Sequence, residues 1–161
     1  MKVRETMSAQ LTDKHIAALA EGAFVAGVAV MNIDGDATES ERDTIIKVVV
    51  GWDSRSEVVT AVTDHIKSEM QSTSGFEYNF DEKKQALAKA AYQTMSDSDK
   101  YRYLWFVEQI TMNVAAASGG NLSGQPVSEA EMNMGAFVMS IISGTDLDVP
   151  AYRAYIDSAG A

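Results

Sequence analysis

The chain has 161 residues, a formal charge of −10 and no cysteine. Its length fits one domain with a hydrophobic core of its own. The lack of cysteine excludes disulfides, thiolate zinc sites and cysteine nucleophiles, and it suits a reducing compartment. Because so acidic a surface repels phosphate backbones, we expect no nucleic-acid partner. The first residues are polar and lead to no long apolar run, so we expect a cytoplasmic protein without a signal peptide.

The composition favours an all-α fold. The only prolines are Pro126 and Pro150, and alanine, methionine and glutamate are plentiful. The most apolar stretch, residues 17–33, contains Glu21 and several small residues. It therefore predicts a buried core helix and not a membrane span, and we expect no direct insertion into a membrane.

The first predicted helix begins at Thr12, a favourable cap that an acidic residue follows. Its apolar residues recur at helical spacing up to the sequence Asp34-Gly35, where glycine allows a backbone conformation that ends the helix. Thr38, with a glutamate three residues later, forms a capping-box pattern that opens a second helix. The β-branched run of residues 45–50 is compatible with a strand, but the strong cap before it favours a helix.

The middle of the chain predicts two further helices joined by an extended link. Ser54 and Glu57 form another capping-box pattern, ahead of a helix that frays in residues 71–75. Residues 76–80 alternate like a strand but have no evident partner strand, so we expect a link whose aromatic side chains dock on the core. Residues 81–95 then form a helix with one apolar stripe.

Three more helices are predicted in the last part of the chain. Their starts are Ser96 with Asp99, Ser128 with Glu131, and Asp148. The first of the three is apolar on more than one side, which predicts a central place in the core, and the second ends at Gly144. The sequence therefore predicts an all-α, compact bundle of about seven helices, with residues 1–161 forming one domain.

Two parts of the chain share one order of features: a helix, a glycine turn, a capping box and an apolar helix. These pseudo-repeats span about residues 12–51 and 97–143, and the two-helix middle section joins them. The second unit has the longer loop. Since repeats of one supersecondary unit usually pack as a pair, we predict an internal duplication.

The turn between the first two predicted helices is acidic. It follows an apolar, alanine-rich helix and reads Asp34-Gly35-Asp36-Ala37-Thr38-Glu39-Ser40-Glu41-Arg42. This sequence resembles the first turn of the TerB-like domains of tellurite-resistance systems. The two-helix middle section and the turn before Ser128-Glu129-Ala130-Glu131 also fall where that family has them, so the resemblance covers about residues 19–155. It implies an all-helical domain, a role in tellurite or chemical-stress response, and a divalent-metal site built from the acidic turns.

One part of the chain departs from the family pattern. The family's second turn usually begins with Asp-Gly, whereas this chain has Ser118-Gly119-Gly120 at that place. Only Glu129 and Glu131 remain there as ligands to carry over, so the second half contributes less to a shared cation. The candidate metal ligands are therefore Asp34, Asp36, Glu41 and Glu131.

The first turn has the oxygen-bearing side chains that a hard cation prefers. They are Asp34, Asp36, Thr38 and Glu41. With two histidines and no cysteine in the chain, calcium or magnesium is favoured over zinc. The turn is shorter than an EF-hand loop and has Val30 at the place of that loop's first aspartate. Helix capping alone accounts for every residue of the turn except Asp36 and Glu39, so a purely structural cap is the open alternative.

Four other titratable side chains are weaker candidates for a functional site, namely His15, His65, Glu21 and Glu108. Neither histidine has a matched partner nearby in the sequence, and His65 is predicted to lie at the surface. The two glutamates interrupt apolar stretches. We expect them at the exposed edge of an apolar face, with a paired buried acid as the alternative. No serine has a His-Asp context, so the sequence does not support nucleophilic catalysis.

The leading hypothesis for the function is a non-enzymatic, TerB-like binding module that holds a divalent cation. Direct capture of tellurite is unfavourable because tellurite is an oxyanion and the surface is strongly acidic. The resemblance implies partners among other tellurite- and stress-response proteins, including membrane-associated ones, and a homodimer is a further option. One alternative is a carboxylate–metal hydrolase, in which the four candidate ligands surround a metal-bound water. The other is a ligand-free helical scaffold or oligomerisation domain.

Overall fold

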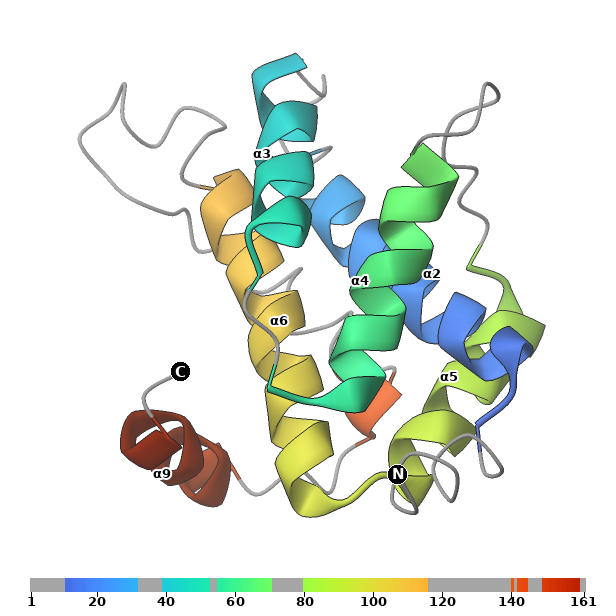
Figure 1. Ribbon diagram of the computed structural model, residues 1–161, viewed down its shortest axis with the longest axis vertical. Helices are drawn as coiled ribbons and strands as arrows, with labels where there is room; N and C mark the ends of the chain where they lie inside the picture. The colour runs from blue at the N-terminus through green and yellow to red at the C-terminus, as the bar shows by residue number, and fades with distance from the viewer. Residues whose placement is uncertain are drawn as a thin grey trace.

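The computed structural model describes residues 11–31, 39–52, 55–70, 80–115, 140, 142–144 and 149–159. These residues form helices without a strand, which confirms the predicted all-α class (Figure 1). The helices whose bounds fall within these residues are α2 (Asp13–Met31), α3 (Glu39–Val50), α4 (Glu57–Met70), α5 (Glu82–Thr94), α6 (Asp97–Ala115) and α9 (Val149–Ala159). The run of residues 45–50 is helical, so the strand alternative is wrong there.

The start of α2 is capped as predicted, and His15 has a part in the cap. The backbone N–H of His15 donates to Thr12 Oγ1 at 3.4 Å, and the backbone N–H of Thr12 donates to His15 Nδ1 at 3.1 Å. The pair is a capping box in which the imidazole accepts the bond that a glutamate usually accepts. This assigns His15 a structural role that the spacing did not predict.

The cap of α4 is Ser56 and not the predicted Ser54, which lies outside the described residues. The hydroxyl oxygen of Ser56 accepts from the backbone N–H of Val59 at 3.3 Å, and its hydroxyl donates to Asp99 Oδ1 at 2.7 Å. One serine therefore caps α4 and ties it to the first turn of α6.

The cap of α6 at Ser96 and the stop at Gly144 confirm the sequence prediction, and Asp81, predicted as the first residue of a helix over 81–95, is the cap of α5. Asp81 Oδ1 accepts from the backbone N–H of Lys84 at 2.9 Å, and Ser96 Oγ accepts from the backbone N–H of Asp99 at 3.2 Å. Gly144 has φ 75° and its N–H donates to the carbonyl of Ser140 at 2.8 Å. Such a left-handed residue at a helix end favours glycine, which has no Cβ to clash.

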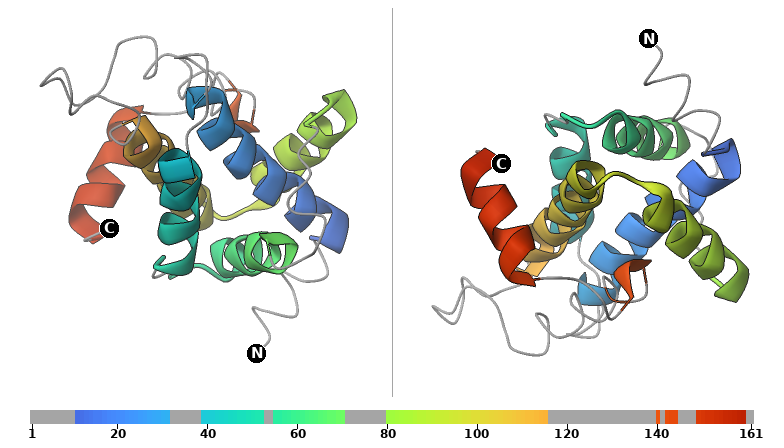
Figure 2. Two further views of the ribbon diagram at one scale, coloured as in Figure 1. Left: turned by 90° about the horizontal axis from the view of Figure 1, so that it is seen from above. Right: turned by 90° about the horizontal axis from the view of Figure 1, so that it is seen from below.

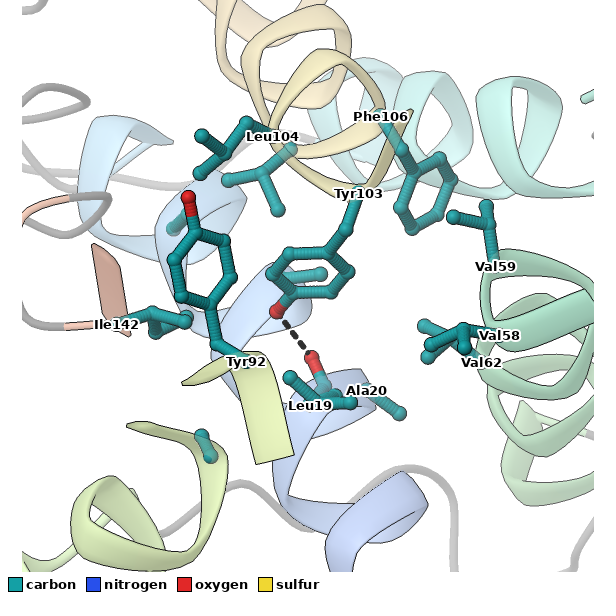
Figure 3. Close-up of a cluster of buried hydrophobic side chains, with 14 of the residues drawn as sticks. Leu19, Ala20, Val58, Val59, Val62, Tyr92, Tyr103, Leu104, Phe106 and Ile142 are labelled. Carbon is teal, nitrogen blue, oxygen red and sulfur yellow. Dashed lines mark hydrogen bonds between the residues drawn. The ribbon is translucent and has the colours of Figure 1, made fainter. Parts of the chain in front are cut away.

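Helix α2 lies at the centre of the bundle and packs against α4, α5 and α6, while α3 packs mainly on α6 (Figures 1 and 2). Figure 3 shows side chains of α6 in the middle of the core: Tyr103 points toward Leu19 of α2, Phe106 lies beside Val59 of α4, and Leu104 lies on the side of Tyr103 away from α4. This confirms the central place predicted for that helix. The buried core continues through Leu19, Ala23, Ile45, Val49, Val59, Val62, Ile66, Ala91, Val107, Ile110 and Ile142.

Two glycines let neighbouring side chains approach α2 closely. A Cβ on Gly27 would lie 2.8 Å from Ile110 Cγ2 and 2.8 Å from Ile45 Cδ1. A Cβ on Gly22 would lie 2.8 Å from Ile142 Cδ1 and 3.0 Å from Phe80 Cζ. The second contact confirms, for Phe80, that the link before α5 docks on the core. Small residues in α2 thus permit the close approach of other helices.

Several fold predictions fall outside the described residues. The predicted helix that starts at Ser128 is described only at Ser140 and at residues 142–144, where it ends. The cap at Asp148 lies just before the described start of α9. The count of seven helices and the pseudo-repeats of residues 12–51 and 97–143 stay predictions for this reason.

Candidate functional site

The predicted metal ligands fall almost entirely outside the described residues. Asp34, Asp36 and Glu131 lie outside them. The backbone of Glu41 belongs to the first turn of α3, but its side chain is not among those described. The convergence of the four carboxylates therefore stays a prediction.

The helices that flank the predicted turns are described, and their ends lie together. The C-terminal ends of α2 and α6 and the N-terminal end of α3 are at the same end of the bundle (Figures 1 and 2). Gly27 near the end of α2 packs on Ile110 of α6 and Ile45 of α3, which is a direct contact between the three helices. The helices that precede the two predicted turns are therefore in contact near Gly27 and Ile110.

The helix ends at this end of the bundle carry partial charges of both signs, negative at the C-terminal ends of α2 and α6 and positive at the N-terminal end of α3. The C-terminal end of a helix carries partial negative charge from its unpaired carbonyl groups. A lysine, arginine or histidine commonly compensates this charge in the last turn, but α2 and α6 have no basic residue in their last turns.

The described part of the chain has no group of three or more His, Asp or Glu side chains arranged to hold a metal ion. His15 belongs to the α2 cap. His65 Nε2 lies 3.8 Å from Glu69 Oε1 on α4, and its side chain is partly exposed, close to the predicted surface position. Neither histidine therefore has the carboxylate neighbours that a metal centre needs among these residues.

Glu21 is buried and paired, so the prediction of an exposed edge position was wrong. The residue is 6% exposed, and its Oε2 lies 2.9 Å from Lys84 Nζ of α5. Lys84 Nζ also donates to Glu21 Oε1 at 3.1 Å. Lys84 is 63 residues away from Glu21 in the sequence, so the sequence could not show this pairing, which depends on how α2 and α5 pack. The ion pair joins the two helices, and we assign it a role in holding α5 on α2.

Glu108 is also paired and largely buried, and the expected exposed edge position was wrong for it as well. The side chain is 15% exposed. Its Oε2 accepts from the hydroxyl of Tyr152 at 2.8 Å and from Nη1 of Arg153 at 3.1 Å, and its Oε1 accepts from Nη2 of the same arginine. Glu108 thus receives three donors from α9.

Aromatic and hydroxyl groups extend this contact along α6 and α9. The ring of Tyr101 lies 5.8 Å from that of Tyr152 and 5.4 Å from that of Tyr155, measured between centroids. The hydroxyl oxygens of Ser98 and Tyr155 are 2.7 Å apart, and Arg102 Nε donates to the Tyr155 hydroxyl at 3.3 Å. These residues, with Glu108 and Arg153, form what we call the α6–α9 contact.

The two tyrosines of α9 have opposite pKa shifts. Burial, together with the bond to the negatively charged Glu108, raises the pKa of Tyr152 above its ordinary value. The hydrogen bonds with Ser98 and with Arg102 lower the pKa of Tyr155, because both stabilise the phenolate. Sequence reasoning missed these roles because Ser98 and Tyr155 lie 57 residues apart.

Comparison with known proteins adds no assignment: no family model, no curated protein and no solved structure matches the chain. Among the described helices, none is both long enough and apolar enough to cross a membrane.

Proposed function

We propose that the protein is a TerB-like, non-enzymatic binding module that holds a divalent cation at the acidic turn of residues 34–41. Its role would be in the response to tellurite or to chemical stress, as the resemblance of this turn implies. The cation would be calcium or magnesium, since the ligands offered are carboxylate and hydroxyl oxygens. Asp34, Asp36 and Glu41 are the proposed ligands of the first turn, and Glu131 is the proposed contribution of the second.

One observation carries the proposal. The described ends of α2, α3 and α6 share one end of the bundle, and the helices that precede the two predicted turns are in contact near Gly27 and Ile110. Neither α2 nor α6 has a basic residue in its last turn, and the N-terminal end of α3 offers only the partial positive charge of its free N–H groups to the proposed carboxylate ligands, which repel one another. A bound cation would relieve the repulsion between these charges.

Equilibrium dialysis and calorimetry with calcium, magnesium and zinc test the cation site. The full chain should take up calcium or magnesium, and a double variant Asp34→Asn, Asp36→Asn should not. The matched control is Asp64→Asn with Asp157→Asn, which removes the same charge from exposed positions of α4 and α9. Uptake that is equal in both double variants would overturn the site, as would no uptake by the native chain.

Binding should also stabilise the folded protein, because a ligand that binds only the native state shifts unfolding by mass action. The midpoint of thermal unfolding should rise with calcium or magnesium in the native chain and in the control variant, and stay constant in the Asp34→Asn, Asp36→Asn variant. Metal-dependent hydrolysis of a model ester by the native chain would instead favour the hydrolase alternative.

The proposed role in stress tolerance needs a measurement in cells. Cells that depend on this protein for growth in tellurite should lose tolerance when they carry the Asp34→Asn, Asp36→Asn variant and keep it with the control variant. If cells with either variant tolerate tellurite equally well, the cation site has no part in the stress response, and this part of the proposal is wrong.

A further inference from the structure

The cap at the start of α2 differs from an ordinary capping box in one residue. Thr12 is the cap, and Leu11 and Ile16 stand at the two positions of a hydrophobic staple, one before the cap and one in the first turn after it. Leu11 is 7% exposed and Ile16 packs against the core, so this motif fixes where the chain enters the bundle. The position that has glutamate or glutamine in an ordinary capping box has His15.

The hydrogen bonds of this cap determine where the imidazole carries its proton. The backbone N–H of Thr12 can only donate, and its nitrogen lies 3.1 Å from His15 Nδ1, so Nδ1 must offer a lone pair. The hydroxyl oxygen of Thr12 lies 3.0 Å from the same nitrogen and accepts from the backbone N–H of His15, which leaves the hydroxyl hydrogen to point at Nδ1. The ring is therefore neutral, with its hydrogen on Nε2.

Protonation of His15 would remove the acceptor on which the cap depends. The new Nδ1–H would face the backbone N–H of Thr12, and only the Thr12 hydroxyl could still bond to the ring, by accepting from it. The imidazolium would also bring positive charge to the helix end whose free N–H groups already carry partial positive charge. A glutamate at this position keeps its acceptor oxygens and its negative charge over the range in which histidine changes its charge.

The charged groups near His15 do not stabilise the imidazolium. On α2 itself, Asp13 and Lys14 precede the histidine and carry opposite charges. Helices α3, α4, α5 and α6 pack against α2, but within the described part of the chain the His15 side chain has no ion pair or other electrostatic interaction with any of them. The bonds with Thr12 are therefore the described interactions of His15 that respond to its protonation.

We propose that His15 makes the start of α2 a pH-sensitive cap, which is closed by the neutral imidazole and opens when the ring is protonated. Opening would release the chain ahead of Ile16, including the buried Leu11, while the rest of α2 stays packed in the core. Histidine suits such a switch, because it is the residue type that changes its charge between about pH 5 and pH 8. The proposal is independent of the cation site, which would follow the other end of α2.

Nuclear magnetic resonance on the full chain tests the cap at about pH 8 and about pH 5. The ¹⁵N chemical shifts of His15 should show an unprotonated Nδ1 at the higher pH. The amide of Ile16, which donates to the carbonyl of Thr12 at 3.1 Å, reports whether the first turn is closed. Its protection factor against hydrogen exchange should fall about fivefold at the lower pH, the factor expected for the loss of a typical cap. The amide of Val62, in the buried part of α4, should change less.

Two variants show whether His15 is the group that responds. His15→Glu restores an ordinary capping box, so Ile16 should keep its protection at both pH values. His65→Gln removes the other histidine of the chain and should leave the response of the native protein unchanged. A proton on Nδ1 at the higher pH would overturn the proposal, and this measurement needs no variant. Constant protection of Ile16 in the native chain, or an equal fall in the His15→Glu variant, would overturn it as well.

Discussion

The hydroxyl of Tyr103 on α6 donates to the carbonyl oxygen of Leu19 on α2 at 2.7 Å, and both residues are fully buried (Figure 3). The bond joins positions 84 residues apart. It satisfies a phenol that would otherwise be a buried polar group without a partner, and it fixes where the two central helices cross. The core of the bundle is therefore held by a specific polar contact as well as by apolar packing.

The Tyr103–Leu19 bond predicts the effect of removing one oxygen atom. Tyr103→Phe should lower the free energy of unfolding by about 1 kcal/mol, the usual net contribution of an intramolecular hydrogen bond. Urea denaturation followed by circular dichroism measures the change. Tyr92→Phe is the control, since the structure records no hydrogen bond for that hydroxyl within the described residues. A loss for Tyr103→Phe no greater than for Tyr92→Phe would contradict the stabilising role of the bond.

The close approach at Gly27 predicts that a single added methyl group is harmful. Gly27→Ala would place Cβ 2.8 Å from the stiff, β-branched Cγ2 of Ile110. Overpacking of this kind costs about 1–3 kcal/mol, which exceeds the gain of about 1 kcal/mol in helix propensity. The unfolding midpoint in urea should therefore fall. Ser68→Ala, at an exposed position of α4, adds a better helix former without a clash and should leave the midpoint unchanged or slightly higher.

The buried ion pair of Glu21 and Lys84 should contribute to the packing of α5 on α2. Lys84→Met keeps the apolar stem but removes the charge beside a buried carboxylate. We expect a loss of about 1–2 kcal/mol, below that for a wholly buried pair, because the lysine side chain is 39% exposed. Lys83→Met, at the exposed neighbouring position, is the control. A double-mutant cycle with Glu21→Gln isolates the pair, and a coupling near zero would show that the two charges act independently.

Buried tyrosines should make the protein sensitive to alkaline pH. Burial, with smaller effects of Tyr101 and Asp97, raises the pKa of Tyr92 from 10.0 to about 12, and burial raises the pKa of Tyr103 as well. Since these folded-state pKa values exceed the unfolded ones, the unfolded chain releases its phenolic protons first. The resulting stability is full below pH 10 and is lost as the pH rises toward 12.

Urea denaturation at a series of pH values checks this dependence. The free energy of unfolding should fall by about 2–3 kcal/mol between pH 10 and pH 12 on account of Tyr92 alone, and Tyr92→Phe should flatten that part of the curve. Phenolate absorbance in the native state should appear first from Tyr155, whose pKa is lowered, so Tyr155→Phe should remove the earliest step. A native chain with constant stability over this range would contradict the role of burial.

The sequence alone determined the features that depend on neighbours three or four residues apart. Thr12 and Ser96 cap helices as their spacing predicted, and Gly144 ends one with positive φ. Local sequence is enough to predict such caps, because a cap needs only one side chain and the first free N–H groups of its own helix. The acidic turn of residues 34–41 was found by the same local reasoning, and the proposed convergence of its carboxylates with Glu131 would depend on how the helices pack.

Tertiary structure decided the contacts that join distant positions. Glu21 meets Lys84 across 63 residues, Glu108 meets Arg153 across 45, and Ser56 meets Asp99 across 43. No local pattern specifies these pairs, because each depends on the angle and register at which two helices pack. The two glutamates were expected at exposed edges since a lone acid in an apolar stretch is usually solvated. Burial became favourable only because a partner on another helix supplied a charge and hydrogen bonds at that position.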